Sequence, residues 1–293
     1  LTLRKIKSRY QSRWRTLTID YVRLLYRLTS QRLRMYNLNG IQKWIDLECG
    51  FQPHLSASNI NLFKNNLSMW ILRYGYDKVT YSSPSMDRGT ACELGIVSAL
   101  TEKLTLKQAT NQAIEYYNDQ VHTDHDDHVK QVAYIEPIIK NAYDTLVELG
   151  IPEFDEGDRQ QKVEFELVDH EQNWVADIIG YLDLVYPDKG LIVDIKTTLR
   201  TPSVMSWSHQ LQRAIYQTGK DNYSVKFLYV TPKASTFRED GDKSILEQAK
   251  VYVNKMNYFC YMLSPSQAKR CIPLQDDFYF NGHQDLKEFY NGH

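Results

Sequence analysis

Apolar residues recur along this 293-residue chain with two spacings, which separate a helix-rich part from a strand-rich part. From about 55 to 150 they return every three or four positions, which predicts amphipathic helices. From about 160 to 232 they alternate with polar residues or form short runs, which predicts strands. A helical spacing returns after 244. This order predicts a mixed α/β (α+β) fold, in which helices flank a central mixed β-sheet.

Flanking residues refine the bounds of the expected elements. A serine before an apolar-periodic stretch favours a helix start, and a glycine after one favours a helix end. The expected helices cover 55–71, 88–100, 105–119, 129–149, 207–218 and 244–263. The expected strands cover 162–168, 174–185, 191–197 and 225–230. We expect one domain over 35–293, with a helical part at about 55–150, a sheet core at about 160–232, and a C-terminal helix and tail at 244–293.

The two strands on either side of 187–190 predict a β-hairpin with a defined register. Pro187 suits the second position of a type I turn, and Gly190 supplies a left-handed residue that closes a four-residue loop. Tyr186 then faces Leu191. The remaining pairs follow by counting outward from this one.

This register gathers four side chains on one face of the hairpin. It places Asp183 opposite Asp194 and Tyr181 opposite Lys196. Because side chains alternate along a strand, all four lie on the same side. The opposite face is apolar and suits a core: Leu182, Leu184, Val193 and Ile195.

The facing carboxylates of Asp183 and Asp194 favour a bound cation, because like charges across a strand pair repel. A hard cation such as Mg²⁺ takes carboxylate oxygens and keeps several waters. Lys196 can orient a water nucleophile or offset the charge that develops on a phosphate. The hairpin therefore predicts a site for a divalent metal and a phosphodiester. The alternative is a surface hairpin whose polar face is simply solvated.

Charge is distributed unevenly, although the formal net charge is only −1. Residues 1–34 hold ten basic residues and one acidic residue, so the rest of the chain is acidic. Such a basic arm can bind phosphates without sequence specificity. The chain starts at Leu1 and its first methionine is Met35, so the arm is either a native basic amphipathic helix or upstream sequence translated in frame. We assign no function to it.

The four cysteines are widely spaced and form no CxxC pair, which argues against a disulfide framework or a zinc knuckle. We therefore expect reduced thiols and a cytoplasmic protein. No apolar run approaches the ~20 residues that span a bilayer, and the charged start lacks the apolar region of a signal peptide. No membrane partner is expected.

Histidines and aspartates alternate in the run HTDHDDH at 122–128. The spacing does not fit that of a two-zinc hydrolase motif. The acids precede an expected helix at 129 and complement its N-terminal dipole. We interpret the run as a solvated loop.

Short motifs spread over about 55–230 resemble those of the PD-(D/E)XK nucleases, specifically the RecB-type and phage-exonuclease branch. The segment LSAS at 55–58 is similar to the one that often opens such domains. The motifs correspond to RGTACE at 88–93, GYLD at 180–183, DIK at 194–196 and QRAIY at 212–216. The resemblance implies a restriction-endonuclease-like core with a helical N-terminal part.

The resemblance also implies a metal centre in which Asp183, Asp194, Glu93 and the Ile195 carbonyl hold Mg²⁺ or Mn²⁺. Lys196 would position the attacking water and stabilise developing negative charge.

A second group of residues is expected to support the site or touch DNA. Gln212 and Tyr216 lie one helical turn apart and would brace the site or contact the DNA backbone. Tyr181 is a candidate for lining a groove, and Arg88 and Arg200 are candidates for phosphate contacts.

The implied activity is that of a metal-dependent deoxyribonuclease, with exonuclease action on DNA ends in phage-type recombination or DNA repair. DNA is the expected partner, in the cytosol of a bacterium or a phage-infected host. The chain has no G-x-x-x-x-G-K-[ST] motif, so coupling to ATP would need a partner. A helicase or a single-strand annealing protein is the candidate.

Some relatives carry an iron–sulfur cluster on one early cysteine and three late clustered ones. Here Cys49 is early, but only Cys260 and Cys271 are late, so no cluster is expected. Two other functions remain open: an endonuclease of the same fold, selective for structure or sequence, and a catalytically inactive nucleic-acid-binding module.

Overall fold

The computed structural model describes residues 39–292, except for 48–49, 79, 81, 102–103, 121–126, 156–159, 169–173 and 243. Its helices are α2 (Asn39–Asp46), α3 (Ala57–Asn65), α4 (Leu67–Tyr76), α5 (Pro84–Leu100), α6 (Leu106–Gln120), α7 (His128–Leu146), α8 (Trp207–Gly219), α9 (Ile245–Met262), α10 (Pro265–Cys271) and α11 (Gln284–Asn291). Its strands are β1 (Gln161–Val168), β2 (Trp174–Leu182), β3 (Leu184–Tyr186), β4 (Leu191–Thr197), β5 (Ser224–Val230) and β6 (Ser235–Arg238). Short 3₁₀ turns are η1 (Val147–Leu149), η2 (Pro187–Lys189) and η3 (Phe278–Phe280). The basic arm at 1–34 lies outside the described residues.

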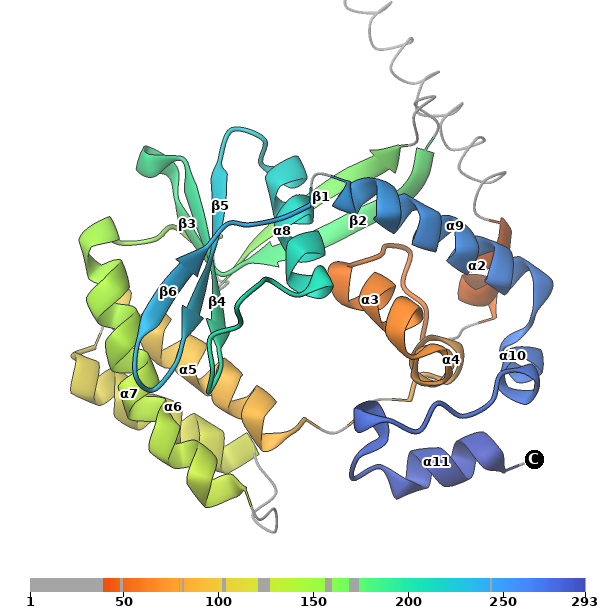
Figure 1. The fold of residues 1–293 in the computed structure, drawn as a ribbon, viewed down its shortest axis with the longest axis horizontal. Coiled ribbons are helices and arrows are strands. Elements are labelled where there is room, and N and C mark those ends of the chain that lie inside the picture. Colours follow the sequence, from red (N-terminus) through yellow and green to blue (C-terminus); the bar gives the residue numbers. More distant parts are fainter. Residues whose placement is uncertain are drawn as a thin grey trace, which may run out of the picture.

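The strands form a four-stranded sheet and a two-stranded ribbon. The sheet has the order β3-β4-β5-β6, in which only the β4–β5 pair is parallel. The connection between these two parallel strands contains α8, as a parallel pair requires a crossover. The ribbon pairs β1 with β2 in antiparallel fashion. The mixed α/β fold with helices in its N-terminal part is thus confirmed (Figure 1).

The four-stranded sheet separates two hydrophobic clusters. On one face, Val193 and Leu228 join the buried side chains of α5, α6 and α7. On the other face, Ile192 and Phe227 join a larger cluster that contains residues of α3, α4, α8 and α9. Alternation along β4 and β5 sends neighbouring residues to opposite clusters. The sheet is therefore covered on both faces, with the α5–α7 layer at the lower left of Figure 1.

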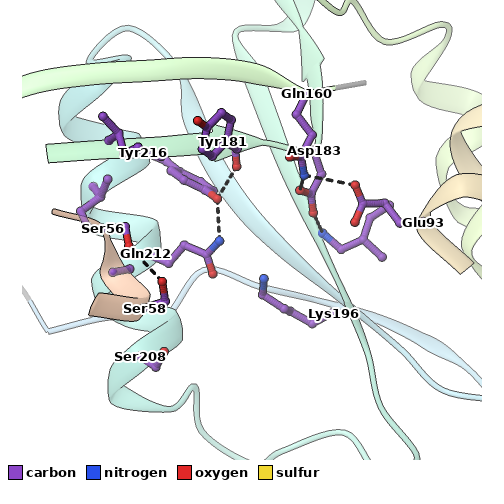
Figure 2. Close-up of a pocket in the computed structure, with 15 residues that line it drawn as sticks. Ser56, Ser58, Glu93, Gln160, Tyr181, Asp183, Lys196, Ser208, Gln212 and Tyr216 are labelled. Carbon is purple, nitrogen blue, oxygen red and sulfur yellow. Dashed lines mark hydrogen bonds between the residues drawn. The ribbon is translucent and has the colours of Figure 1, made fainter. Parts of the chain in front are cut away.

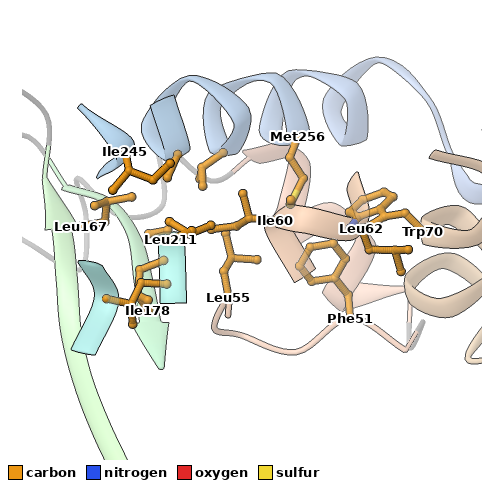
Figure 3. Close-up of a cluster of buried hydrophobic side chains, with 14 of the residues drawn as sticks. Phe51, Leu55, Ile60, Leu62, Trp70, Leu167, Ile178, Leu211, Ile245 and Met256 are labelled. Carbon is orange, nitrogen blue, oxygen red and sulfur yellow. The ribbon is translucent and has the colours of Figure 1, made fainter. Parts of the chain in front are cut away.

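The larger cluster also covers the β1–β2 ribbon. Figure 3 shows Ile178 of β2, Leu211 of α8 and Ile245 of α9 at one end of this cluster, and Trp70 of α4 at the other. The backbone of Leu55 also ties the segment before α3 to β2. Its N–H donates to the Asp177 carbonyl at 2.9 Å, and its carbonyl accepts from the N–H of Ile179 at 2.8 Å. This pairing fixes the start of α3 beside β2.

The expected continuous strand at 174–185 is wrong, because the chain bends at Asp183. β2 ends at Leu182 and pairs with β1, whereas β3 begins at Leu184 and pairs with β4. Leu182 consequently lies in the larger cluster and Leu184 in the α5–α7 cluster. One run of sequence therefore serves two sheets.

The predicted hairpin register is confirmed on the β3 side of the bend only. Residues 184–186 pair with 193–191, as the turn predicts, and Gly190 has φ +53°. Beyond the bend, Tyr181 lies opposite Lys162 of β1, so the expected pairing of Tyr181 with Lys196 is wrong. Two apolar strand segments on either side of Asp183 gave no local signal that they belong to different sheets.

The expected helix at 55–71 is also wrong, because Asn66 divides it into α3 and α4. Asn66 has an extended backbone, and its side-chain oxygen caps α4 by accepting from the N–H of Met69 at 2.8 Å. Its amide group donates to the Gln275 carbonyl and the Asp277 carboxylate, both at 2.9 Å. The break is thus set by contacts with a segment two hundred residues away in sequence.

Most other elements match their expected bounds within about two residues, namely α6, α7 together with η1, α8, α9, β1, β4 and β5. α5 starts at Pro84 rather than Arg88, because Ser83 caps the helix and proline suits its first turn. The pattern missed α2, β6, α10 and α11. Among the described helices, none is both long and apolar enough to cross a membrane.

Gly180 permits close packing of β2 on α8, and this gives a testable prediction. A Cβ at Gly180 would lie 2.7 Å from Cε1 of Tyr216. We expect Gly180→Ala to lower the free energy of unfolding by about 1–3 kcal/mol through overpacking, as measured by chemical denaturation. Gly241→Ala is the control, since its Cβ would meet only the flexible Arg213 guanidinium at 3.4 Å. Equal stability of the two variants would contradict this packing.

Candidate active site

A cavity of about 330 Å³ lies where the bend at Asp183 meets β4, α5, α3 and α8. Figure 2 shows Asp183 and Glu93 with Gln160 on one side, and serines of α8 and of the start of α3 on the other. Lys196 projects between these two sides. The cavity therefore joins segments that are far apart in sequence.

Asp183 occupies the bend and takes over a hydrogen bond that a strand would otherwise make. Its Oδ2 accepts from the backbone N–H of Ile195 in β4 at 2.8 Å. The pairing of β3 with β4 stops at Leu184 and Val193, so the Ile195 N–H faces no residue of β3. The Asp183 carboxylate satisfies this donor instead. The N–H and C=O of one strand residue point to the same side. The Ile195 carbonyl is therefore directed toward the side of the strand where Asp183 lies.

Asp194 and Lys196 lie on the same face of β4, as predicted, two residues apart. The Asp194 side chain is fully buried, and its Oδ1 accepts from Gln212 Nε2 at 3.1 Å. Its Oδ2 forms an ion pair with Lys196 Nζ at 2.6 Å and makes no well-directed hydrogen bond within the described part of the chain. The Oδ2 atom of this buried carboxylate is thus held beside the Lys196 ammonium.

Gln212 and Tyr216 of α8 connect this carboxylate to β2, which supports their predicted bracing role. The Gln212 amide donates both to Asp194 and to the Tyr216 hydroxyl at 2.5 Å. The Tyr216 hydroxyl in turn donates to the backbone carbonyl of Tyr181. A chain of hydrogen bonds therefore runs from β4 through α8 to the strand that leads into Asp183.

Glu93 reaches the cavity from α5, and Gln160 joins it to Asp183. The Gln160 Nε2 group donates to Glu93 Oε1 at 3.1 Å and to Asp183 Oδ1 at 2.8 Å. Sequence reasoning placed Glu93 here but missed Gln160, which precedes β1 in an irregular segment without a motif. It noted LSAS at 55–58 as a motif without assigning Ser56 or Ser58 to the site, and it missed Ser208 in the cavity wall.

Burial and mutual repulsion dominate the electrostatics of the site. Burial raises the pKa of Asp183 well above its usual value, and the negative charges of Asp194 and Glu93 raise it further. Burial also raises the pKa of Asp194, against the opposing effect of Lys196. Burial alone would lower the pKa of the Lys196 ammonium, but Asp194 and Asp183 outweigh it and the pKa is raised. Lys196 is therefore cationic at neutral pH.

The remaining predicted contacts are placed less closely around the cavity. Tyr181 lines it with a side chain that is 48% exposed. Arg200 is exposed in the segment after β4 and is not part of the lining. Arg88 is only 3% exposed and donates to the Gln131 side chain of α7 instead. Its burial against α7 argues against the expected phosphate contact.

The donors at this site are compatible with a hard divalent cation. Carboxylate and carbonyl oxygens are what Mg²⁺ and Mn²⁺ prefer, and the buried Oδ2 of Asp194 lies beside the Lys196 ammonium. Within the described ranges, however, no three His, Cys, Asp or Glu side chains form a ready metal-binding group. The amide of Gln160 lies between Glu93 and Asp183, and the ammonium of Lys196 lies against Asp194. Neutral or positive protein groups thus already contact the carboxylates.

Two other sequence signals lie apart from the cavity or outside the description. Cys92 and Cys260 are buried in different hydrophobic clusters and Cys271 is exposed, while Cys49 lies outside the described residues. Most of the histidine run, 122–126, is likewise not described. His128 begins α7 and stacks on Tyr117, with ring centroids 4.9 Å apart.

Comparisons with known proteins do not assign the chain to a family. No protein-family model matches it, and no curated protein matches it. A solved structure titled "Crystal structure of SSO0001" is similar over 75% of this chain and 97% of its own, with 10% identity and a TM-score of 0.31. A likeness at this TM-score supports no argument about function.

Removal of one buried charge is expected to stabilise the metal-free protein. Because the pKa of Asp183 is raised on folding, the folded state holds this proton more tightly, and stability falls as pH rises from 3.8 through the raised value. Asp183→Asn cannot ionise and avoids this loss. In EDTA at pH 8 we expect its free energy of unfolding to exceed that of wild type by about 1 kcal/mol or more, so that it unfolds at a higher temperature, with a smaller difference at pH 5.

Circular dichroism during heating measures this difference. Asp188→Asn, in the exposed turn after β3, is the matched control and should leave the unfolding temperature unchanged. A lower unfolding temperature for Asp183→Asn at pH 8 would show that the Asp183 charge stabilises the fold.

Proposed function

We propose that this chain is a metal-dependent DNA nuclease with a restriction-endonuclease-like core, acting as an exonuclease that hydrolyses phosphodiester bonds from DNA ends. The observation that supports this most is that Asp183 and Lys196 line one cavity, while the buried Asp194 carboxylate forms an ion pair with Lys196 beside it. Their order matches the D…DxK motifs of the PD-(D/E)XK resemblance. Phage-type recombination or DNA repair in the cytosol, with a helicase or single-strand annealing protein as partner, is the setting that this resemblance implies.

The acidic groups and one backbone carbonyl are the proposed metal ligands. Asp183, Asp194, Glu93 and the Ile195 carbonyl would hold Mg²⁺ or Mn²⁺, since all of them offer oxygen. When bound, the cation supplies Lewis-acid polarisation of the phosphate and acidification of a water molecule. The hydrogen bond from Ile195 N–H and the Gln212 amide hold the two aspartates in place for this task.

Lys196 provides positive charge beside the reacting phosphate. Its ion pair with Asp194 directs the ammonium into the cavity, where it is partly exposed. A cation at this position stabilises the negative charge that develops when a phosphodiester is attacked. Because its pKa is raised, Lys196 acts through its charge and does not take up a proton from water.

The wall opposite the carboxylates suits the phosphate backbone of DNA. Ser56 is the N-cap of α3, and Ser208 lies in the first turn of α8. Helix N-termini favour anions through their dipole and their first-turn N–H groups. The serine hydroxyls add donors that can reach phosphate oxygens. The acidic side chains and the serines thus lie on opposite sides of the cavity (Figure 2).

An endonuclease of the same fold, and a binding module without catalysis, would use the same cavity. Digestion of end-labelled linear DNA and closed circular DNA in Mg²⁺ or Mn²⁺ distinguishes these activities. Equal cutting of closed circles would replace the exonuclease proposal with an endonuclease. DNA binding without cleavage in either metal would leave the binding module.

Substitutions at the site test the assignment of its residues. We expect Asp194→Asn and Lys196→Met each to lower the rate of DNA cleavage by about 10²-fold or more, because each removes a charge that acts on the transition state. Lys226→Met is the control for Lys196, since Lys226 lies on the adjacent strand β5 and pairs with Glu239 outside the cavity. Cleavage that survives both site substitutions would show that the chemistry occurs elsewhere.

A further inference from the structure

Gln160 links two acidic side chains that come from different parts of the fold. Its Nε2 group donates to Glu93 of α5 and to Asp183 of the bend, at 3.1 and 2.8 Å. The backbone sets this position, because the next residue, Gln161, pairs with Leu182 at the start of the ribbon. The amide is therefore carried to the side of Asp183 by the β1–β2 register.

This link uses the whole donor capacity of one amide group. A primary amide has two N–H donors, and here each serves a different carboxylate. The result offsets part of the repulsion between Glu93 and Asp183 with a neutral group. A divalent cation would offset the same repulsion far better, and it would draw on the same two carboxylates.

We propose that Gln160 is a placeholder for the metal: its amide holds Glu93 and Asp183 together in the metal-free protein and competes with the cation for both carboxylates. The inference rests on the proposed function and adds a residue that tunes metal affinity. The Gln160 side chain is half-buried and borders the cavity. Rotation about its side-chain bonds would therefore let the amide turn away from the two carboxylates. Metal binding then requires Gln160 to release both oxygens.

Competition of this kind predicts that loss of the amide strengthens metal binding. Gln160→Met keeps the length of the side chain but removes both donors. We expect Mn²⁺ to bind Gln160→Met about tenfold more tightly than wild type, because two hydrogen bonds no longer have to be broken. In EDTA the same variant should unfold at a lower temperature, since the two carboxylates lose their shared donor. Titration of Mn²⁺ followed by the electron paramagnetic resonance signal of the free ion measures the affinity without DNA or turnover.

Two further variants make the result specific. Gln161→Met changes the neighbouring glutamine, whose amide donates to the Glu153 carbonyl outside the cavity, and should bind Mn²⁺ like wild type. Gln160→Ala repeats the test if methionine perturbs folding, which circular dichroism reports. Equal or weaker Mn²⁺ binding by the Gln160 variants would overturn the inference.

The failure of this inference and that of the proposed function have different signatures. Mn²⁺ binding to wild type that Asp183→Asn abolishes, but that Gln160 variants do not strengthen, would overturn only the placeholder. An absence of Mn²⁺ binding in wild type and in every Gln160 variant would overturn the metal site itself, and with it both proposals.

Discussion

The hydrogen bond from the Ile195 N–H to the Asp183 carboxylate is the interaction on which the arrangement of the site depends. It lies at the point where one run of chain leaves the β1–β2 ribbon and enters the four-stranded sheet. A strand that changes sheets leaves backbone donors facing no partner, and such donors are costly when buried. Here the Asp183 side chain accepts from that donor, and the same hydrogen bond fixes its carboxylate beside β4. The same bend aligns Asp183 with Asp194 and Lys196.

The acidic side chains of the site repel one another, and other contacts hold them together. Three acidic side chains approach one another in a buried place, where the charged form of a carboxylate is disfavoured. Lys196, the Gln160 amide and the Gln212 amide each compensate part of this cost. The electrostatic repulsion that remains lowers stability, and such a loss of stability is common at functional sites. The two hydrophobic clusters on either side of the sheet supply the stability that allows it.

Local sequence predicted what local geometry determines. The turn at 187–190 and the alternation along 191–197 were enough to predict the pairing of β3 with β4 and the shared face of Asp194 and Lys196. The bend at Asp183 could not be predicted, because apolar residues precede and follow it and the partner of β2 is chosen by tertiary packing. The same holds for Asn66, which breaks a helix through contacts with Gln275 and Asp277. Gln160 lies in an irregular segment, where only the folded chain brings its amide to the carboxylates.

The path from Asp194 through Gln212 and Tyr216 to the Tyr181 carbonyl crosses from one sheet to the other, as does the bond between Ile195 and Asp183. The two aspartates therefore lie where the ribbon meets the sheet, one at the bend and one in β4, and their placement depends on how the ribbon and the sheet pack together. Because the ribbon packs against α8 and α9, a substitution that loosens this packing is expected to alter the placement of both aspartates without touching either of them.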